Sequence, residues 1–285
     1  MTEATASTAE PAATPHGLGT LAADMWSMGK AGLTTTGEII AMMLDTAVLL
    51  VQSFLRRTFP FREFVDQSWF LASVSLLPTI LIAIPFGMVV VLEVGGLAGQ
   101  IGATSYVGAV DAIGTVRDAA PIVTALLLAG AGGSAICSDL GARTVREEIS
   151  AMEVLGINPL QRLVAPRVLA SVFIAVLLNG TVAMTAIVSG YLADVYFLHG
   201  TPGGFLTTFS TFAQSSDIVV SIIKAAVFGF ITAVVASYKG LHTKPGPSGV
   251  GTSVNEAVVV TGVALFLVNL LITQMYLTIA PPRIV

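Results

Sequence analysis

One strongly charged segment lies between long apolar runs: Thr144-Val-Arg-Glu-Glu-Ile-Ser-Ala-Met-Glu-Val-Leu-Gly-Ile-Asn-Pro159. Thr144 and Glu147 have the spacing of a capping box, which satisfies the free amides of a helix start. Gly156 suits the left-handed position that follows a helix, and Asn158-Pro159 stops the chain from continuing as a helix. The segment therefore predicts a self-capped helix of about three turns over residues 144–156. Because isolated short helices are marginal in water, we expect this helix to dock on another surface.

The composition around this segment is that of a membrane protein. The chain has 285 residues, of which 54% are hydrophobic and 11% are charged, and its mean hydropathy is +0.87. Soluble domains carry roughly 25% charged residues. The net charge of −4 does not suggest nucleic-acid binding, and the single cysteine, Cys137, rules out an internal disulfide framework. We expect an all-α integral membrane protein.

Apolar runs long enough to cross a bilayer predict five transmembrane helices. They cover residues 69–92, 119–138, 164–191, 218–237 and 254–279. The second run contains an Ala/Gly-rich core, residues 129–135, where small side chains let helices approach closely. We expect residues 1–36 to form a mostly disordered tail and residues 37–285 to form a single membrane domain.

The segment 37–57 has a different pattern. Glu38, Asp45 and Gln52 recur every seven residues and form one polar stripe opposite an apolar face. This pattern favours an amphipathic helix that lies in the membrane interface. A full transmembrane span is the alternative.

The segments between the runs are predicted to be mainly loops. Residues 95–114 are a loop or a short helix, residues 194–217 a loop with a surface helix over 204–214, and residues 239–252 a loop. Basic residues gather on one side of this topology, which predicts that side to be cytoplasmic. The N-terminus, the 144–156 helix and the 239–252 loop are then cytoplasmic, while the 194–217 loop and the C-terminus lie outside.

The sequence carries no recognisable catalytic or metal-binding pattern. Its three histidines, His16, His199 and His242, are far apart, and a phosphate-binding loop is absent from the sequence. The expectation is therefore a chain that is not an enzyme, with no catalytic residues and no metal site. It would also bind no cofactor of its own.

Four ionisable residues near membrane depth are candidates for a lipid path or another intramembrane polar site: Glu93, Arg117, Asp118 and Lys224. Asp194 also lies near a span end. Most of these residues lie where a side chain can reach the interface, so simple snorkelling is the competing interpretation. Lys224 lies deepest, and we expect it to pair with a carboxylate that the sequence does not identify.

The charged segment closely resembles the signature E-E/Q-x-x-x-M-E-x-x-x-x-(N/D)-P of MlaE/YrbE permeases. Three further stretches fit the same family: residues 117–130, residues 160–167 and the stretch from Ser248 to Val254. The resemblance covers about residues 37–278. The Mce-type YrbE permeases of actinobacteria are similar. Some members carry an arginine near Ala131-Gly132, which this chain lacks, so no role of that arginine is carried over.

The resemblance implies a permease subunit of an ATP-driven ABC transporter that moves lipids or other hydrophobic substrates, such as fatty acids, across the cell envelope of a bacterium. It implies a place in the inner membrane, a second permease subunit, MCE-domain proteins on the outer face, and a cytoplasmic ATPase dimer that binds ATP and Mg. The 144–156 helix would be the coupling helix. Its expected ATPase-coupling residues are Arg146, Glu147, Glu148, Met152, Glu153, Gly156, Asn158 and Pro159.

Two other functions remain open at this point. An ion-coupled secondary carrier would be expected to have inverted repeats and midplane sites, which fit five spans poorly. A non-transporting membrane anchor of an envelope complex would bind partners without moving lipid. Co-purification with an ATPase whose turnover rises in the presence of this chain distinguishes the ABC permease from both of these alternatives.

Overall fold

A computed structural model describes residues 18–55, 59–103 and 106–279 of the chain. Contacts divide it into two compact units, residues 1–41 and residues 42–285. All regular elements in the described ranges are helical. They are α1 (Leu18–Leu55), α2 (Phe61–Gln100), α3 (Val107–Ile113), η2 (Gly114–Ala119), α4 (Ala120–Leu127), η3 (Leu128–Gly133), α5 (Ser134–Val145), α6 (Glu148–Val154), η4 (Leu160–Val164), α7 (Ala165–Phe197), α8 (Pro202–Phe212), α9 (Ser215–Leu241) and α10 (Pro247–Ile279), where η marks a π-helical segment.

Six helical stretches in the described ranges are long and apolar enough to cross a membrane. They are Gly32–Ser53, Phe61–Gln100, Val107–Val145, Leu160–Phe197, Ser215–Leu241 and Pro247–Thr278. The expected helical membrane protein is therefore confirmed, but the count exceeds the expected five. The additional stretch overlaps the segment for which the polar stripe favours an interfacial helix, and that placement stays a prediction.

The expected disordered tail over residues 1–36 is wrong from Leu18 onward. Helix α1 runs from Leu18 to Leu55, and residues 1–17 lie outside the described ranges. The physical reason is that proline is absent from the sequence between Pro15 and Pro60. Glycine destabilises a helix interior by only about 1 kcal/mol relative to alanine, so the glycines in this interval do not end the helix.

The helices of the five expected spans are longer than predicted. Helix α2 covers Phe61–Gln100 where 69–92 was expected, because hydrogen bonding continues until Gly102, whose φ of +71° ends the helix. The second span is likewise part of a helical run over Val107–Val145. For residues 95–114 either a loop or a short helix was expected, and α3, Val107–Ile113, is the short helix. Apolar length indicates the part of a helix suited to lipid, whereas the helix itself ends at a residue that breaks the hydrogen bonding.

The two expected loops near the C-terminus are shorter than predicted. The expected surface helix over 204–214 is present as α8, Pro202–Phe212, while α7 and α9 extend into the predicted loop on either side. Between α9 and α10 only residues 242–246 are outside a helix. Pro247 begins α10 here, because proline is well suited to the first turn of a helix even though it breaks a helix interior.

Small residues permit the close packing of the membrane helices in residues 42–285. Helix α2 packs along α7, and a Cβ atom added at Gly87 would lie 2.6 Å from the Cα of Ala186. In the Ala/Gly-rich core of the second span, a Cβ added at Gly133 would lie 3.2 Å from the Cγ2 of Thr232 on α9. The expected close approach at this core is confirmed at Gly133.

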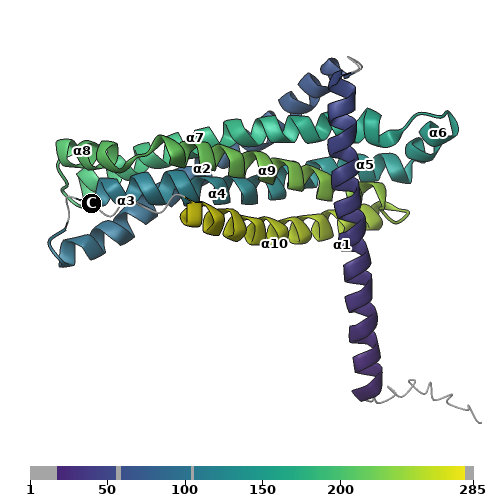
Figure 1. The fold of residues 1–285 in the computed structure, drawn as a ribbon, viewed down its shortest axis with the longest axis horizontal. Coiled ribbons are helices and arrows are strands. Elements are labelled where there is room, and N and C mark those ends of the chain that lie inside the picture. The colour runs from purple at the N-terminus through teal and green to yellow at the C-terminus, as the bar shows by residue number, and fades with distance from the viewer. Residues whose placement is uncertain (1–17, 56–58, 104–105, 280–285) are drawn as a thin grey trace, which may run out of the picture. The chain divides into compact units, whose positions relative to one another are not determined.

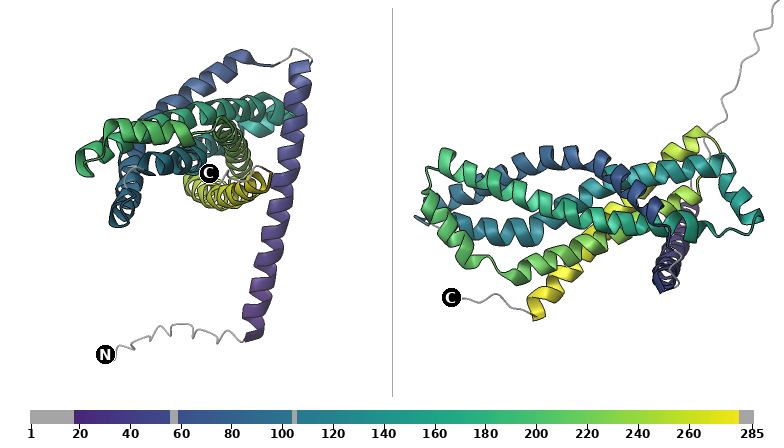
Figure 2. Two further views of the ribbon diagram at one scale, coloured as in Figure 1. Left: turned by 60° about the vertical axis from the view of Figure 1, so that its left-hand side comes forward. Right: turned by 90° about the horizontal axis from the view of Figure 1, so that it is seen from above.

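The short helices mark the two ends of this unit. Figure 1 shows α6 at one end and α8 together with α3 at the other, and the view from above in Figure 2 keeps the same arrangement. At the α8 end, Phe205 is buried and its ring lies 5.4 Å from the ring of Tyr191 on α7. Helix α6 therefore lies far from the elements that the topology prediction places outside.

Candidate functional site

The turn that leads into α6 reverses the chain within a few residues. Helix α5 continues to Val145, and Glu147 then adopts a left-handed conformation with φ of 59°. The amide of Glu147 donates to the carbonyl oxygen of Thr144 at 3.0 Å, and Glu147 itself is exposed. Left-handed backbone is uncommon for a residue other than glycine, so the turn holds Glu147 in a strained conformation.

The predicted capping box is wrong. Thr144 lies inside α5, and its hydroxyl shares a hydrogen bond between the carbonyl oxygens of Leu140 at 3.0 Å and Gly240 at 3.1 Å. The helix is Glu148–Val154, seven residues long, instead of 144–156. The threonine hydroxyl finds its acceptors on α5 and α9, so it joins these two helices and does not begin a new one.

The predicted end of the helix is confirmed. Gly156 has φ of +72°, its amide donates to the carbonyl oxygen of Glu153, and the amide of Ile157 donates to that of Met152, both at 2.9 Å. This pair of bonds is the Schellman arrangement. The side chain of Asn158 then accepts a hydrogen bond from the amide of Leu160 at 2.9 Å, where the next helical segment begins.

Replacing Gly156 with valine is expected to loosen α6 by about 1–2 kcal/mol, because a β-branched residue fits the left-handed conformation poorly. Hydrogen exchange of the α6 amides should then quicken by about tenfold. Asparagine tolerates this conformation better than other residues, so Gly156→Asn is the matched control and should change exchange little. Equal exchange in the valine variant and the wild type would show that the helix end does not hold α6 in place.

A buried arginine anchors this region inside the helix bundle. Arg167, near the start of α7, is 0% exposed, and its guanidinium donates to the carbonyl oxygen of Leu163 at 2.9 Å and to a carboxylate oxygen of Asp139 on α5. Arginine cannot lose its proton in proteins, so this buried group depends on the carboxylate. The pair fixes the relative positions of α5 and α7 next to the turn.

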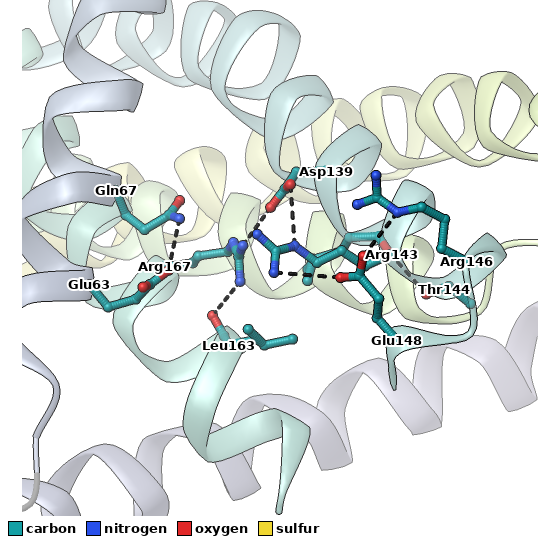
Figure 3. A network of polar contacts seen from close by, with 10 residues as sticks. Glu63, Gln67, Asp139, Arg143, Thr144, Arg146, Glu148, Leu163 and Arg167 are labelled. Carbon is teal, nitrogen blue, oxygen red and sulfur yellow. Dashed lines mark hydrogen bonds and ion pairs between the residues drawn. The ribbon is translucent and has the colours of Figure 1, made fainter. Parts of the chain in front are cut away.

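Further ion pairs join this buried pair to α6. Arg143 lies 3.3 Å from Asp139 and 3.8 Å from Glu148, measured between nitrogen and oxygen atoms, and Arg146 lies 3.0 Å from Glu148. Figure 3 shows these side chains as a continuous series from Arg167 to the surface. We call Arg167, Asp139, Arg143, Glu148 and Arg146 the charge relay of α6. A displacement of α6 would strain contacts that end on a fully buried group.

The tip of α6 presents apolar side chains to the solvent. Ile149 is buried and anchors the helix, whereas Val154 is 88% and Leu155 is 73% exposed. Ile157, just after the helix, is also exposed. Apolar side chains that gather at an exposed tip are typical of a protein-binding surface. Glu153 is exposed beside them and adds a charge to that surface.

A second polar cluster joins η2 to α9. Lys224 is 0% exposed, and its ammonium group donates to Asp118 at 2.9 Å and to the carbonyl oxygen of Arg117 at 3.1 Å. Arg117 also pairs with Asp118 at 3.3 Å and lies over the ring of Tyr276 at 5.9 Å. The expected carboxylate partner of Lys224 is thus present. Glu93 is exposed on α2, and no hydrogen bond or ion pair within the described residues joins it to this cluster.

Three ionisable residues were not predicted as site residues from the sequence. Arg167 and Asp111 are 0% exposed, whereas the side chain of Asp139 is 37% exposed. Asp111 on α3 accepts a hydrogen bond from Thr115 at 2.6 Å. The spacing of Asp139 and Arg143, four residues apart on one helix, was an available signal for an ion pair. In the described ranges, no three His, Cys, Asp or Glu side chains are placed to hold a metal ion.

Comparison with known proteins places the chain in one family. A family model described as Permease MlaE matches residues 64–275. A probable ABC transporter permease protein of Rickettsia bellii is 26% identical over 226 residues, which cover 79% of this chain and 87% of the relative. One of Synechocystis is 33% identical over 183 residues, covering 64% and 70%.

A further relative has a more specific name. The intermembrane phospholipid transport system permease protein MlaE of Haemophilus influenzae is 28% identical over 234 residues, covering 82% of this chain and 85% of the relative. The family match includes α6, the charge relay, and Arg117, Asp118 and Lys224. The resemblance noted from the charged segment is confirmed, and this chain, a multi-pass helical membrane protein, belongs to the MlaE permease family.

Proposed function

We propose that this chain is the membrane-spanning permease subunit of an ATP-driven ABC transporter that moves lipids across the bacterial cell envelope. The observation that carries the proposal is the exposed tip of α6, which the charge relay joins to the buried Arg167. Relatives named as ABC transporter permeases, and one named for phospholipid transport, support the same function. ATP and Mg would bind to a separate ATPase chain, and this chain would have no catalytic role.

In this proposal, α6 and the residues after it form the ATPase-coupling site. Val154 and Leu155 insert into an apolar groove of the ATPase, and the exposed Glu147 and Glu153 meet basic groups around it. Glu148 and Arg146 have another role than direct contact, because they pair with each other inside the charge relay. The direction in which the chain leaves α6 is determined by Gly156, Asn158 and Pro159.

The other partners follow from the same proposal. A cytoplasmic ATPase dimer would contact α6 in each of two permease subunits, and MCE-domain proteins would lie on the outer face. A second permease subunit would pack against one of the apolar faces that the membrane helices expose, such as Val263, Phe266 and Leu270 on α10. The chain would lie in the inner membrane with its N-terminus in the cytoplasm and its C-terminus outside.

The function is tested with the permease purified together with its ATPase and reconstituted into liposomes. We expect ATP-dependent transfer of a fluorescent phospholipid and an ATPase turnover that rises when the permease is present. Transfer driven by an ion gradient without ATP would indicate a secondary carrier instead. A stable complex that moves no lipid under either condition would indicate a membrane anchor, and both results would overturn the proposal.

The orientation is tested by labelling single cysteines in intact cells. Because basic residues gather beside α6, a cysteine at Ser150 should be protected from a membrane-impermeant thiol reagent. A cysteine at Thr207 on α8 should react, and both positions are exposed in the structure. Each is introduced into a Cys137→Ser background. Reaction at Ser150→Cys but not at Thr207→Cys would reverse the proposed topology.

A further inference from the structure

An apolar cavity lies toward the end of the bundle that carries α3 and α8. It borders the cluster around Lys224, because its lining includes Val116, next to Arg117, and Asp217, which accepts a hydrogen bond from Tyr276. It has a volume of about 400 Å³ and is lined by side chains of α3, η2, α7, α8 and α9. Each element contributes at least one apolar residue to the lining; in the same order, examples are Ala112, Val116, Ile187, Phe209 and Ile222. The lining is almost entirely apolar, which suits a hydrocarbon ligand.

Four polar residues are present in this lining: Asn179, Gln214, Asp217 and Ser221. Asp217 already accepts a hydrogen bond from the hydroxyl of Tyr276 at 2.9 Å, whereas Asn179 has a polar atom to spare. Asn179 is 4% exposed, lines the cavity on α7, and its amide nitrogen donates to the hydroxyl of Ser221 on α9 at 2.8 Å. The amide oxygen has no hydrogen-bond partner in the part of the chain that the structure describes. A buried polar atom without a partner is unfavourable by about 1–3 kcal/mol, so such an atom calls for a physical explanation.

The unpartnered end remains whichever way the amide is turned. If the group is rotated by half a turn, Ser221 donates to its oxygen and the amide nitrogen is left without a partner. The terminal torsion of asparagine is broad and roughly two-fold, so both arrangements are accessible. Asn179 and Ser221 together therefore offer one donor and one acceptor beside an apolar cavity. A ligand group that both donates and accepts hydrogen bonds would satisfy them.

The volume indicates the size of the apolar part of the ligand. An apolar cavity of about 150 Å³ holds a benzene molecule, so about 400 Å³ has room for roughly 16 carbon atoms. Gly180 lies on the wall, and a Cβ atom added there would meet nothing within 4 Å. The wall is therefore open at this point, next to the polar pair.

We infer that this cavity binds a single hydrocarbon chain of about 16 carbons whose carboxyl or hydroxyl group is held by Asn179 and Ser221. The ligand class is a long-chain fatty acid or fatty alcohol. The site lies within one permease chain and is formed by its own helices. Binding here requires neither ATP nor the coupling role of α6, so it can be measured separately from transport.

The chain-binding part is tested with hexadecanoic acid that carries a diazirine in its chain. The complete complex, held in phosphatidylcholine nanodiscs, is irradiated with this probe without ATP, and labelled peptides are identified by mass spectrometry. Labels are expected on the α7 and α9 segments that line the cavity. Gly180→Leu should reduce this labelling at least about fivefold, because its side chain fills the open space.

The matched control is Gly262→Leu. Gly262 lies on α10, lines a different apolar cavity of about 230 Å³, and likewise has nothing within 4 Å of an added Cβ. This variant should leave the α7 and α9 labels unchanged. Equal labelling of the Gly180→Leu variant and the wild type would overturn the inference, and so would an equal loss in both variants.

The polar part is tested by comparing the acid probe with a diazirine hexadecane that lacks oxygen. In the wild type, the acid should label the cavity about fivefold more strongly, which is the effect of one net hydrogen bond. Asn179→Leu should abolish this preference while retaining labelling by the hydrocarbon, and Ser221→Ala should weaken the preference. Equal labelling of the wild type by both probes would overturn the assignment of the end group.

Two further arms separate the alternatives. The first arm uses a phosphatidylcholine with a diazirine in one acyl chain as a probe for the same segments. Labelling by this lipid but not by the acid would mean that the cavity binds a membrane phospholipid, which would overturn the inference. Lipid transfer is measured in parallel with the labelling. Loss of the cavity labels with transfer intact overturns only the inference, whereas failure of ATP-dependent transfer with the labels intact overturns only the proposed function.

Discussion

Replacing Asp139 with leucine is expected to destabilise the protein by about 3–5 kcal/mol. The variant leaves Arg167 charged and fully buried, without the carboxylate that compensates it. Replacing both members of the pair, Asp139→Leu with Arg167→Met, should restore most of the stability, because apolar residues of similar volume often replace a buried ion pair without loss. Denaturant unfolding of the detergent-solubilised protein measures both effects.

The same double variant separates stability from coupling. It folds but lacks the link between α6 and the start of α7, so we expect it to bind the ATPase while ATP hydrolysis no longer moves lipid. The matched control is Asp118→Leu with Lys224→Met, which removes the ion pair of the other buried base and leaves the charge relay intact. This control should retain the increase of ATPase turnover by the permease. Normal lipid transfer by the Asp139→Leu/Arg167→Met chain would show that the charge relay serves stability alone.

Replacing both apolar residues at the tip of α6 with aspartate, Val154→Asp with Leu155→Asp, is expected to abolish co-purification of the ATPase. Burying a valine or leucine side chain at an interface contributes about 1.5–3 kcal/mol, so the pair accounts for roughly 3–6 kcal/mol. The corresponding loss of affinity is about 100-fold or more. Because both side chains are mostly exposed, insertion and stability of the permease should change little.

Ile101→Asp provides the control for this variant. Ile101 is 81% exposed and directly follows α2. Near this end of α2, Gly95 lies against Val107 of α3 and Leu198 after α7, and α3 is at the end of the bundle opposite to α6. The Ile101→Asp variant adds a charge at an equally exposed apolar position and should leave ATPase binding unchanged. Affinity measured by titrating the purified ATPase compares the chains. If the Val154→Asp/Leu155→Asp chain binds the ATPase with wild-type affinity, α6 is not part of the ATPase-coupling site.

Local sequence signals predicted one end of α6 and not the other. Gly156 ends the helix as expected, because the left-handed conformation depends on the residue itself and its near neighbours. Thr144 failed as a cap because its hydroxyl has an acceptor on Gly240, which is 96 residues away in sequence. The family resemblance was also found from local motifs, and it agrees with the family match over residues 64–275.

Long-range polar contacts could not be read from the chain in the same way. Burial of Lys224 was anticipated from its depth in an apolar run, but its partner Asp118 lies 106 residues away in sequence. Arg167 follows Pro166 at the edge of a span, where sequence alone places a basic group in the interface, and only the position of α5 explains its burial. Asn179 gave no signal, because a single amide in an apolar helix does not indicate a cavity.

The buried pairs have a consequence for how the chain is made. In both, the acid is synthesised before the base: Asp139 precedes Arg167 by 28 residues, and Asp118 precedes Lys224 by 106. A carboxyl group in lipid can take up a proton and become uncharged, whereas a guanidinium stays charged. A basic residue is unfavourable by about 3 kcal/mol at the centre of an inserting helix and by less near its end, so the effect is larger for Lys224, inside α9, than for Arg167, near the start of α7. Each later basic helix therefore arrives when its partner is already in the membrane, so the order of synthesis itself lowers the barrier to insertion.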